Sequence, residues 1–505
     1  MKYILAIDQG TTGSRAVVYD KKGKKIASAY REFPQHFPKP GWVEHDPHDL
    51  WRSVNDSVQR VLSEVPPGSI AAIGITNQRE TTVMWDSRTG APVHNAIVWQ
   101  CRRTAGRCDE IKSQRGAAAF FRARTGLPVD AYFSATKIEW ILKNVPGVRA
   151  RAKKGRIRYG TTDSWILWKL TGGQAHATDY TNASRTMCFN IERLEWDEVI
   201  LKKFGIPKEI LPEVKKSSGI FGRTVRIGRL NAGIPISGVA GDQQAALFGQ
   251  TCFEPGTMKN TYGTGCFVLL NTGKSRPVSK HGLITTLGCG PQGEPVYVLE
   301  GAIFVAGAAI QWLRDGLKIL KHAAQSEIMA ESVADNAGVY FVPALVGLGA
   351  PYWDQDARGA IYGITRGTHA SHLVRAALEA MCYQTKDVVD AMQKDSRLKI
   401  KSLKVDGGAV ANDLLCRFQA GILGIEVVRP KVIEITSLGA AYLAGLAVGY
   451  WKDTGQIKRC WAIDKVFRPK MPRKVAMKLY AGWRAAVERT LTQYHSLRSG
   501  TGHRT

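Results

Sequence analysis

A run of small and hydroxyl-bearing residues near the start of the chain has the composition of a phosphate-binding turn. Residues 8–15 read Asp-Gln-Gly-Thr-Thr-Gly-Ser-Arg and lie between two short apolar runs, 3–7 and 16–19. Small residues let backbone N–H groups approach an oxyanion, hydroxyls add donors, and the Asp8 carboxylate can hold a phosphate-bound cation. The spacing differs from G-x-x-x-x-G-K-[ST], which disfavours a Walker-type loop. A tight hairpin made of ordinary turn-forming residues is the alternative interpretation.

Two further glycine turns favour a duplicated nucleotide-binding domain. Residues 260–267 read Asn-Thr-Tyr-Gly-Thr-Gly-Cys-Phe and repeat the small, hydroxyl-rich pattern in the second half of the chain. Similar hairpins in both halves indicate a duplicated domain with a nucleotide in the cleft between the copies. The third turn, 405–413, leads from an expected strand at 403–405 into an expected helix at 414–423. Such a turn offers flat backbone to a base or a ribose.

Asp242 is the candidate acid–base group. It lies where an apolar strand at 235–240 runs into an expected helix at 243–248. A fixed carboxylate in that position can accept a hydroxyl proton during phosphoryl transfer. Its alternative role is that of an ordinary helix N-cap.

A second polar segment follows a buried strand. Residues 77–81 read Asn-Gln-Arg-Glu-Thr and come directly after the expected strand 70–76. Sheets of α/β proteins usually bind ligands at such strand ends. Arg79 and Glu80 offer donors and acceptors to a small polyol, whereas the alternative is a surface ion pair of little energetic value.

The elements that position these segments alternate between strands and helices. Runs at 3–7, 16–19 and 25–30 predict a three-stranded meander, and Asp46-Pro47 opens an amphipathic helix ahead of the strand 70–76. The N-terminal order is therefore β-β-β-α-β. Further elements are expected as a strand at 81–85 and as helices at 134–144, 162–170, 371–392 and 479–491.

The length of the chain predicts more than one domain. With 505 residues it is too long for a single hydrophobic core, so two domains of roughly 250 residues are expected. A hydrophobic content of 44% is typical of folded globular proteins. The turn 254–256 gives the best boundary, so the expected parts are 1–253, 254–450 and a C-terminal helical extension with a basic tail at 451–505. We expect disorder from Ser499 onward.

The cysteines and the apolar segments indicate a cytoplasmic protein. Nine cysteines are scattered without a C-x-x-C pair, which favours reduced thiols over zinc ligation or a disulfide framework. No signal peptide is expected, because the first residues lead straight into a strand. The uncharged segment 435–451 contains three glycines and predicts a buried helix packed on a sheet instead of a membrane span.

The net charge of +27 is high for an enzyme and attracts polyanions. Basic residues concentrate at 149–158 and after Trp451, so contact with RNA or an anionic membrane is one interpretation. Neither segment resembles a recognised nucleic-acid module. Solvated helix faces are the preferred interpretation, with no specific nucleic-acid partner.

Ten segments follow one another in order along the chain, from Tyr3 to about Trp483. They are IDQGTTGSR, PGWVEHDP, ITNQRETT, IVWQCRRT, YFSATKIEWIL, TDYTNASRTM, AGDQQAALFGQ, NTYGTGCF, GLGAPYWD and VDGGAVAN. Together they resemble the FGGY family of carbohydrate kinases. The resemblance implies an α/β fold, in detail a duplicated actin-like (ribonuclease H-like) two-domain fold with ATP and glycerol in an interdomain active-site cleft. It implies transfer of the ATP γ-phosphate to a terminal hydroxyl of glycerol, with Mg²⁺ as metal cofactor.

The resemblance also implies roles for single residues. Asp242 would be the general base, and Asp8 would act on Mg²⁺, through water. Glycerol would contact polar side chains and, on its carbon face, two aromatic rings. The implied substrate-binding residues are Arg79, Glu80, Tyr132, Asp242, Gln243, Trp99 and Phe267; the implied phosphate-binding residues are Thr11, Thr12, Gly13, Arg15 and Thr264; the implied nucleoside-binding residues are Gly307, Gln311, Gly408 and Asn412.

The chain departs from the family pattern in its turn and in one loop. Gly13 stands where many relatives carry Ser, which removes a hydroxyl but keeps the backbone donor. Regulated bacterial relatives bind fructose 1,6-bisphosphate through a Gly-rich loop ending in Arg; here 226–233 reads Arg-Ile-Gly-Arg-Leu-Asn-Ala-Gly, which does not support that control. No histidine occurs between Ser217 and Thr224, where some relatives are phosphorylated. Assembly as a homodimer or homotetramer is implied by kinship alone.

Three alternative functions compete with this interpretation. Another polyol or sugar kinase of the family is disfavoured by the Arg79–Glu80 and Trp99 segments. A nucleotide-gated binding protein on the same fold, like actin, has no evident use for a carboxylate base beside a polyol site. A basic RNA-associated protein is compatible with catalysis, and salt-dependent retention would separate specific from non-specific binding.

Overall fold

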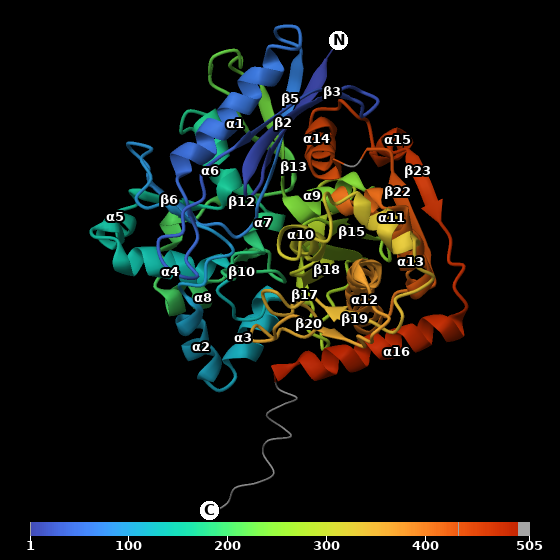
Figure 1. Ribbon diagram of the computed structural model, residues 1–505. Helices are drawn as coiled ribbons and strands as arrows, with labels where there is room; N and C mark the ends of the chain where they lie inside the picture. The colour runs from blue at the N-terminus through green and yellow to red at the C-terminus, as the bar shows by residue number, and fades with distance from the viewer. Residues whose placement is uncertain (1, 433, 493–505) are drawn as a thin grey trace, which may run out of the picture.

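The computed structural model describes residues 2–432 and 434–492, so the expected disordered tail from Ser499 lies outside the described residues (Figure 1). Two mixed β-sheets, one from each half of the chain, form the centre of the molecule. The first sheet contains β1 (Tyr3–Gln9), β2 (Gly13–Tyr19), β3 (Lys25–Glu32), β5 (Ile70–Asn77), β13 (Ser218–Arg223) and β14 (Pro235–Gly241). The second contains β15 (Met258–Tyr262), β16 (Cys266–Gly273), β17 (Ile284–Cys289), β18 (Pro295–Ile303), β21 (Ser402–Asp406), β22 (Glu426–Pro430) and β23 (Ile463–Phe467).

The two sheets repeat one topology. The first has the strand order β13-β14-β5-β1-β2-β3, and the second contains the order β23-β22-β21-β15-β16-β18 with β17 added at its edge. At each corresponding step the pairing agrees: antiparallel, parallel, parallel, antiparallel and antiparallel. The glycine turns within 8–15 and 260–267 join the strands of the two corresponding hairpins, β1–β2 and β15–β16. The predicted duplication is therefore confirmed.

Helix α1 (Pro47–Leu62) covers one face of the first sheet. Asp46 caps it by accepting a 2.8 Å hydrogen bond from the His48 N–H, and Pro47 takes the first helical position, as the sequence predicts. Val54 and Val58 lie on its buried side and pack with the apolar residues of β1 and β2. The predicted β-β-β-α-β order is confirmed, with only the two-residue strand β4 (Glu44–His45) inserted before α1.

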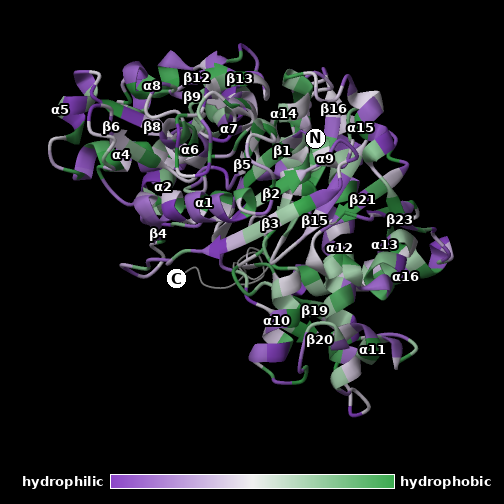
Figure 2. Cartoon of the chain, turned by 90° about the horizontal axis from the view of Figure 1, so that it is seen from above, coloured by the Kyte–Doolittle hydropathy of each residue, from purple (hydrophilic) through white to green (hydrophobic). Residues whose placement is uncertain are grey.

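Helices α9 (Asp242–Gly249) and α14 (Ile435–Ala447) cover the other face. A Cβ on Gly439 would lie 1.8 Å from the Ala245 carbonyl oxygen, and one on Gly74 of β5 would lie 2.2 Å from that of Ala440. Only glycine permits such close backbone packing. Helix α14 is predominantly apolar in Figure 2, and its residues Ile435, Leu438 and Leu443 are buried, which confirms the predicted buried helix. Within residues 2–432 and 434–492, no helix combines enough length and apolarity to span a bilayer.

The expected domain limits stay a prediction. Helix α14 lies within the expected second part, 254–450, but it packs on the first sheet. Trp451, the first aromatic of the expected extension after that limit, is buried in the same cluster. The second half of the chain therefore supplies part of the layer that covers the first sheet.

Several predicted elements have different limits in the structure. The last helix, α16 (Arg473–Thr490), begins before the expected 479–491, because basic residues in its first turns hide the apolar stripe. The strand expected at 81–85 is β6 (Val83–Asp86), because Glu80 adopts a left-handed backbone with φ 61° and delays the extended run. Ser134–Asn144 and Thr162–Leu170 are helical as predicted, and the helix expected at 371–392 spans Ala370–Ser396.

The remaining elements surround the two sheets. Short strands are β7 (Ala96–Ile97), β8 (Ile157–Gly160), β9 (Ala177–Asp179), β10 (Phe189–Asn190), β11 (Glu195–Trp196), β12 (Glu213–Lys215), β19 (Tyr340–Val342) and β20 (Ala360–Tyr362). All nine cysteines are free, and the described residues contain no cluster of His, Cys, Asp and Glu that could hold a metal ion by itself. The helices are α2 (Ala105–Ser113), α3 (Ala117–Thr125), α4 (Ser134–Asn144), α5 (Val148–Lys153), α6 (Thr162–Leu170), α7 (Tyr180–Ala183), α8 (Glu198–Phe204), α10 (Gly307–Asp315), α11 (Gln325–Glu331), α12 (Ala370–Ser396), α13 (Asp413–Leu423) and α15 (Thr454–Cys460), with 3₁₀ turns at Lys208–Ile210 and Gly408–Ala411.

Candidate active site

Asp242 is the first residue of α9, directly after β14. Its carboxylate is 32% exposed, and Oδ1 lies 3.1 Å from Nε of Arg79. The backbone N–H of Gln243 donates to Oδ1 over 2.7 Å, and its amide Nε2 donates to Oδ2 over 3.2 Å. The N-cap position of α9 belongs to Gly241, so the helix does not use this carboxylate as its cap. Asp242 is therefore held in place and still accessible, as a general base must be.

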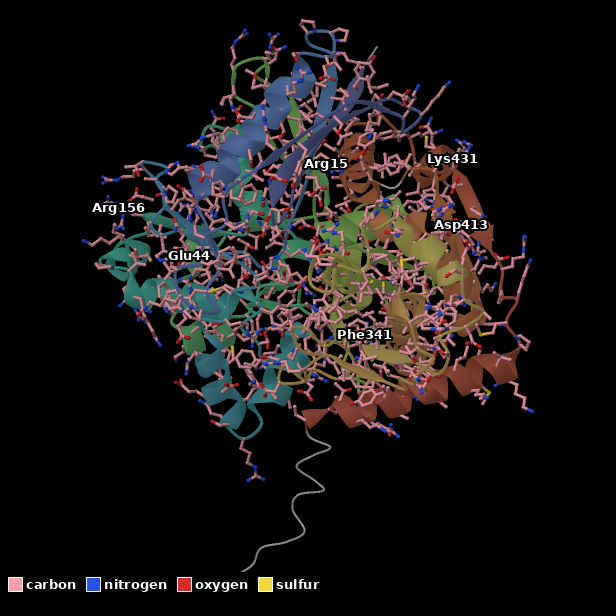
Figure 3. All side chains as sticks on the ribbon, viewed as in Figure 1. Arg15, Glu44, Arg156, Phe341, Asp413 and Lys431 are labelled. Atoms are coloured by element: carbon pink, nitrogen blue, oxygen red, sulfur yellow. The ribbon has the colours of Figure 1, made fainter. Side chains whose placement is uncertain are left out.

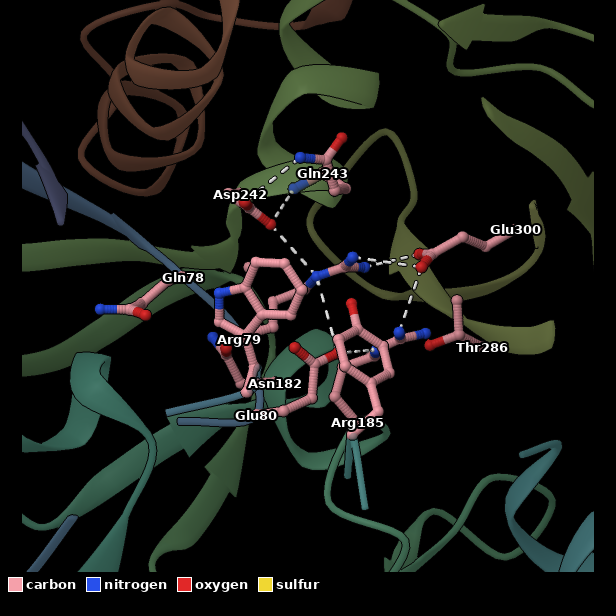
Figure 4. Close-up of polar contacts among 12 residues, drawn as sticks. Gln78, Arg79, Glu80, Asn182, Arg185, Asp242, Gln243, Thr286 and Glu300 are labelled. Atoms are coloured by element: carbon pink, nitrogen blue, oxygen red, sulfur yellow. Dashed lines mark hydrogen bonds and ion pairs between the residues drawn. The ribbon is translucent and has the colours of Figure 1, made fainter. Parts of the chain in front are cut away.

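Arg79 and Glu80 are buried, so the alternative interpretation of a surface ion pair is wrong. Arg79 Nη1 and Nη2 donate to the two carboxylate oxygens of Glu300 on β18, over 2.5 and 3.1 Å. Arg185 donates from Nε to Glu80 Oε1 over 2.6 Å and from Nη2 to Glu300 Oε1 over 3.1 Å. Figure 4 shows Arg79 at the centre, between Asp242 on one side and Glu300 on the other. We call Arg79, Glu80, Arg185 and Glu300 the buried charge cluster.

The cluster keeps its charges through mutual pairing. Burial opposes ionisation, but Arg185 and Arg79 hold the pKa of Glu300 below its ordinary value. For Glu80, burial raises the pKa even though the same two arginines oppose it. A charge this deep is tolerated only with such partners, so each member fixes the others in position.

Sequence reasoning missed Arg185, Glu300 and Lys259. Glu300 and Lys259 are single charges within otherwise apolar or neutral strands, PVYVLEGAI and MKNTY, and that isolation was the available signal. Lys259 donates from Nζ to Gln243 Oε1 over 2.6 Å and to Thr261 Oγ1 over 2.7 Å. Burial lowers the pKa of Lys259 to about 8. It links the second sheet to the residue that follows Asp242.

Aromatic rings line the same region. Trp99 and Tyr132 contact each other edge to face, with 5.5 Å between ring centroids. The Trp99 indole N–H donates to Thr11 Oγ1 over 3.0 Å, which ties this wall to the first hairpin. The Phe267 ring of the second hairpin lies 5.7 Å from the Arg79 guanidinium carbon. The Arg185 guanidinium carbon lies 5.6 Å from the centre of the Tyr132 ring, so the buried charge cluster links this pair of rings to Arg79 and Asp242. The seven residues that the sequence predicts to bind substrate therefore lie in one connected region.

The first hairpin carries a half-buried carboxylate, Asp8, and an exposed threonine, Thr12, at its tip. Asp8 pairs across the ladder with Arg15, whose Nη1 lies 2.9 Å from Glu434 Oε1 in the segment before α14 (Figure 3). Burial and the nearby Asp242 carboxylate raise the pKa of Asp8 to about 7. Two carboxylates that repel each other in this way fit a site for a divalent cation, which favours their ionised forms.

The second hairpin closes onto α10. The Thr264 carbonyl accepts hydrogen bonds from the N–H groups of Ala306, over 2.8 Å, and Ala308, over 3.1 Å. A Cβ on Gly307 would lie 2.6 Å from the Gly263 carbonyl oxygen, so glycine is needed where the helix meets the hairpin. Gln311 is exposed one turn further along α10. The predicted residues Thr264, Gly307 and Gln311 therefore lie together.

The third glycine turn connects β21 to α13 as predicted. A Cβ on Gly408 would meet no atom within 4 Å, so the backbone there is open to a flat ligand. Asn412 caps α13 by accepting a 2.9 Å hydrogen bond from the Leu415 N–H. Its Nδ2 is buried and has no hydrogen-bond partner among the described residues. An unpaired buried donor of this kind fits a ligand acceptor.

Comparison with known proteins identifies the family. The N-terminal domain of the FGGY family of carbohydrate kinases matches residues 3–249, and the C-terminal domain of the same family matches 258–448. The chain is 58% identical to "Glycerol kinase 2" of Thermotoga maritima over 97% of this chain and 99% of that protein. It is 56% identical to a glycerol kinase of Bacillus cereus over 97% of this chain and 99% of that protein.

Solved structures agree with the sequence relatives. The crystal structure of Plasmodium falciparum glycerol kinase with ADP superimposes with a TM-score of 0.90 at 38% identity, covering 97% of this chain and 98% of that chain. A xylulose kinase of Lactobacillus acidophilus gives a TM-score of 0.88 at 24% identity over 98% of this chain and 100% of that chain, which supports the fold alone. The predicted actin-like two-domain α/β fold is confirmed. The chain belongs to the FGGY family of carbohydrate kinases.

Proposed function

We propose that the protein transfers the γ-phosphate of ATP to a terminal hydroxyl of glycerol, giving sn-glycerol 3-phosphate and ADP. The single observation that carries this proposal is the geometry of Asp242, an accessible carboxylate fixed by Arg79 and Gln243 between the two hairpins. The glycerol kinases that are 56 to 58% identical over nearly the full chain support glycerol as the acceptor.

Asp242 acts as the general base in this proposal. A carboxylate oxygen accepts the proton of the terminal hydroxyl while the hydroxyl oxygen forms a bond to the γ-phosphorus. The bond between that phosphorus and the β–γ bridging oxygen breaks, and ADP leaves with the electron pair. Arg79 keeps the carboxylate oriented, so little reorganisation is needed at the moment of reaction.

The hairpin residues hold the phosphates in this proposal. Thr12 and Thr264 are exposed at the two hairpin tips, where hydroxyl and backbone donors can reach phosphate oxygens. Asp8 would hold Mg²⁺ through water, and the ion would supply charge neutralisation at the phosphates. The positively charged Arg15 lies beside Asp8 and adds to the field at the same place.

The buried charge cluster selects a small polyol. Glu80 and Arg79 present acceptors and donors at the ends of β5, and the rings of Trp99 and Phe267 present apolar faces for a carbon chain. A coupled assay of ADP release over a panel of glycerol, longer polyols and ketoses tests the proposal. We expect kcat/KM to be highest with glycerol, and a higher value with a pentulose or no ADP release with glycerol would contradict it.

Asn412→Asp should weaken ATP binding without affecting glycerol. The carboxylate keeps the N-cap of α13, because it still accepts the Leu415 N–H, but it loses the unpartnered Nδ2 donor. We expect the KM for ATP to rise about 3- to 10-fold, the scale of one lost hydrogen bond. Steady-state kinetics against both substrates measures this, with thermal unfolding as a check on the cap. An unchanged KM for ATP would remove Asn412 from the nucleoside site.

The proposal extends to compartment, assembly and partners. Nine free cysteines, eight of them buried, support a reducing compartment, so we place the protein in the cytoplasm. Family membership supports a homodimer or homotetramer, which light scattering tests.

The basic run 149–158 is surface exposed in part, with Arg156 at the edge of the molecule (Figure 3) and 3.7 Å from Asp86. We propose no specific nucleic-acid partner, and RNA retention that persists above physiological salt would contradict this.

A further inference from the structure

We propose that the phenol of Tyr30 on β3 is a phosphate-binding group that takes the place of the side-chain hydroxyl missing at Gly13. This inference rests on the proposed kinase function and adds a residue to its phosphate site. Neither the motif of the first turn nor the family resemblance pointed to Tyr30.

Tyr30 fills the space that a side chain at position 13 would occupy. A Cβ built on Gly13 would lie 2.5 Å from Tyr30 Cζ and 2.5 Å from Tyr30 Oη. A side chain at position 13 would therefore collide with the Tyr30 phenol, so the phenol and its hydroxyl occupy the space beside Gly13. Tyr30 Oη also lies 3.2 Å from Thr12 Oγ1, so the two hydroxyls form a pair at the exposed tip of the turn.

The ladder register places Tyr30 on the face that carries the charged groups of the hairpin. Asp8 pairs with Arg15 across β1 and β2, and Arg15 pairs with Tyr30 across β2 and β3. Residues directly opposite each other in a ladder point to the same face of the sheet. The Arg15 guanidinium carbon lies 5.5 Å from the centre of the Tyr30 ring, which holds the ring beside that cation.

Tyr30 does not serve the hydrophobic core. Its side chain is 44% exposed, and it belongs to none of the hydrophobic clusters of the described residues. The alternative is that Tyr30 is an ordinary surface residue of the outer strand. In that case its hydroxyl would be expected to point into solvent without contacting other side chains. Here the hydroxyl lies against the turn backbone and against Thr12, which a surface role does not explain.

The position also indicates which part of the triphosphate Tyr30 contacts. The neighbouring Thr11 accepts a hydrogen bond from Trp99 in the wall of the proposed glycerol site. The proposed nucleoside residues lie instead on α10 and the β21–α13 turn of the second half. The first hairpin therefore faces the end of the triphosphate that is transferred, away from the adenosine.

Tyr30→Phe tests the proposal, because it removes the hydroxyl and keeps the ring beside Arg15. We expect the KM for ATP and the calorimetric Kd for a non-hydrolysable ATP analogue to rise about 3- to 10-fold. The Kd for AMP and the KM for glycerol should stay within about twofold. A serine at position 13 is a poorer test, because its Cβ would also lie 2.7 Å from the Arg31 carbonyl oxygen.

Tyr450→Phe is the matched control. Tyr450 also has a cation over its ring, Lys21 at 5.4 Å, and its hydroxyl donates to the Lys2 carbonyl over 2.7 Å, far from the turn in sequence. Its kinetics should equal those of the unaltered protein. If the unaltered protein phosphorylates glycerol and Tyr30→Phe binds the ATP analogue normally, this inference alone is overturned. If the unaltered protein releases no ADP with glycerol, the proposed function itself fails.

Discussion

Asp242→Asn lowers kcat by at least about 10²-fold and leaves the fold intact, if Asp242 is the base that accepts the glycerol proton. The amide has nearly the shape of the carboxylate but cannot accept a proton at neutral pH. Arg79 keeps its two hydrogen bonds to Glu300, so the loss of its contact with Asp242 leaves no unpaired buried charge. Steady-state kinetics with saturating ATP and glycerol, together with the thermal unfolding midpoint, measures both parts of this expectation.

Asp49→Asn is the control for this variant. Asp49 is likewise an aspartate in the first turn of a helix with an arginine contact, at 2.8 Å from Arg52, but it is not among the residues proposed to bind glycerol, phosphate or nucleoside. Its kcat should stay within about twofold of the unaltered protein, as expected for an ion pair whose arginine is exposed to solvent. A kcat for Asp242→Asn within tenfold of normal would refute the general-base role, whatever the binding constants show.

The elements around the site were predictable because each has a local signal. Asp46-Pro47 opens α1, the glycine turns at 8–15 and 260–267 join antiparallel strands, and Gly439 within 435–451 allows α14 to pack closely on α9. Turn chemistry, caps and periodicity are properties of short segments, so they can be recognised before the tertiary structure is known. The duplicated order of strands follows from the same signals in each half.

The buried charge cluster could not be predicted, because it pairs residues that are far apart in sequence. Arg79 and Glu300 are separated by 221 positions, and Arg185 contacts Glu80 over 105 positions. The adjacency of Arg79 and Glu80 suggested an ion pair between them, but their closest contact is 3.9 Å and both find better partners. Tyr30 was missed for the same reason, since only the ladder register brings it to the turn. Pairing across sheets depends on topology, which no local pattern contains.

The cluster also explains how the proposed polar glycerol site would be kept rigid inside the protein. Two arginines and two glutamates balance each other in charge, and Glu300 accepts from both arginines. Lys137 also fixes the backbone that carries Tyr132, because its Nζ donates to the carbonyl oxygens of Tyr132, over 2.6 Å, and Phe133, over 3.1 Å. Side chains locked in this way can present donors and acceptors to a small polyol at little entropic cost.

Arg185→Met is expected to lower stability and glycerol affinity together. The substitution keeps an apolar chain of similar length but leaves Glu80 without its 2.6 Å partner and removes one partner of Glu300. Breaking a buried ion pair on one side typically costs about 3–5 kcal/mol of folding free energy. Because Glu80 would then ionise less readily and lose its fixed position, we expect the KM for glycerol to rise by at least about tenfold, with a smaller change in the KM for ATP.

The control separates the general cost of a lost buried ion pair from an effect on the site. Arg375 on α12 donates to Glu379 over 2.7 Å and is mostly buried, and neither residue is among those proposed to bind glycerol. Arg375→Met should therefore lower the unfolding midpoint and leave the KM for glycerol within about twofold. Glycerol should also raise the unfolding midpoint of Arg375→Met as it does for the unaltered protein, because bound ligand stabilises the folded state.

If Arg185→Met keeps both a normal midpoint and a normal KM for glycerol, the cluster does not hold Glu80 for the substrate. If both variants lose stability but neither changes that KM, the cluster supports the fold alone.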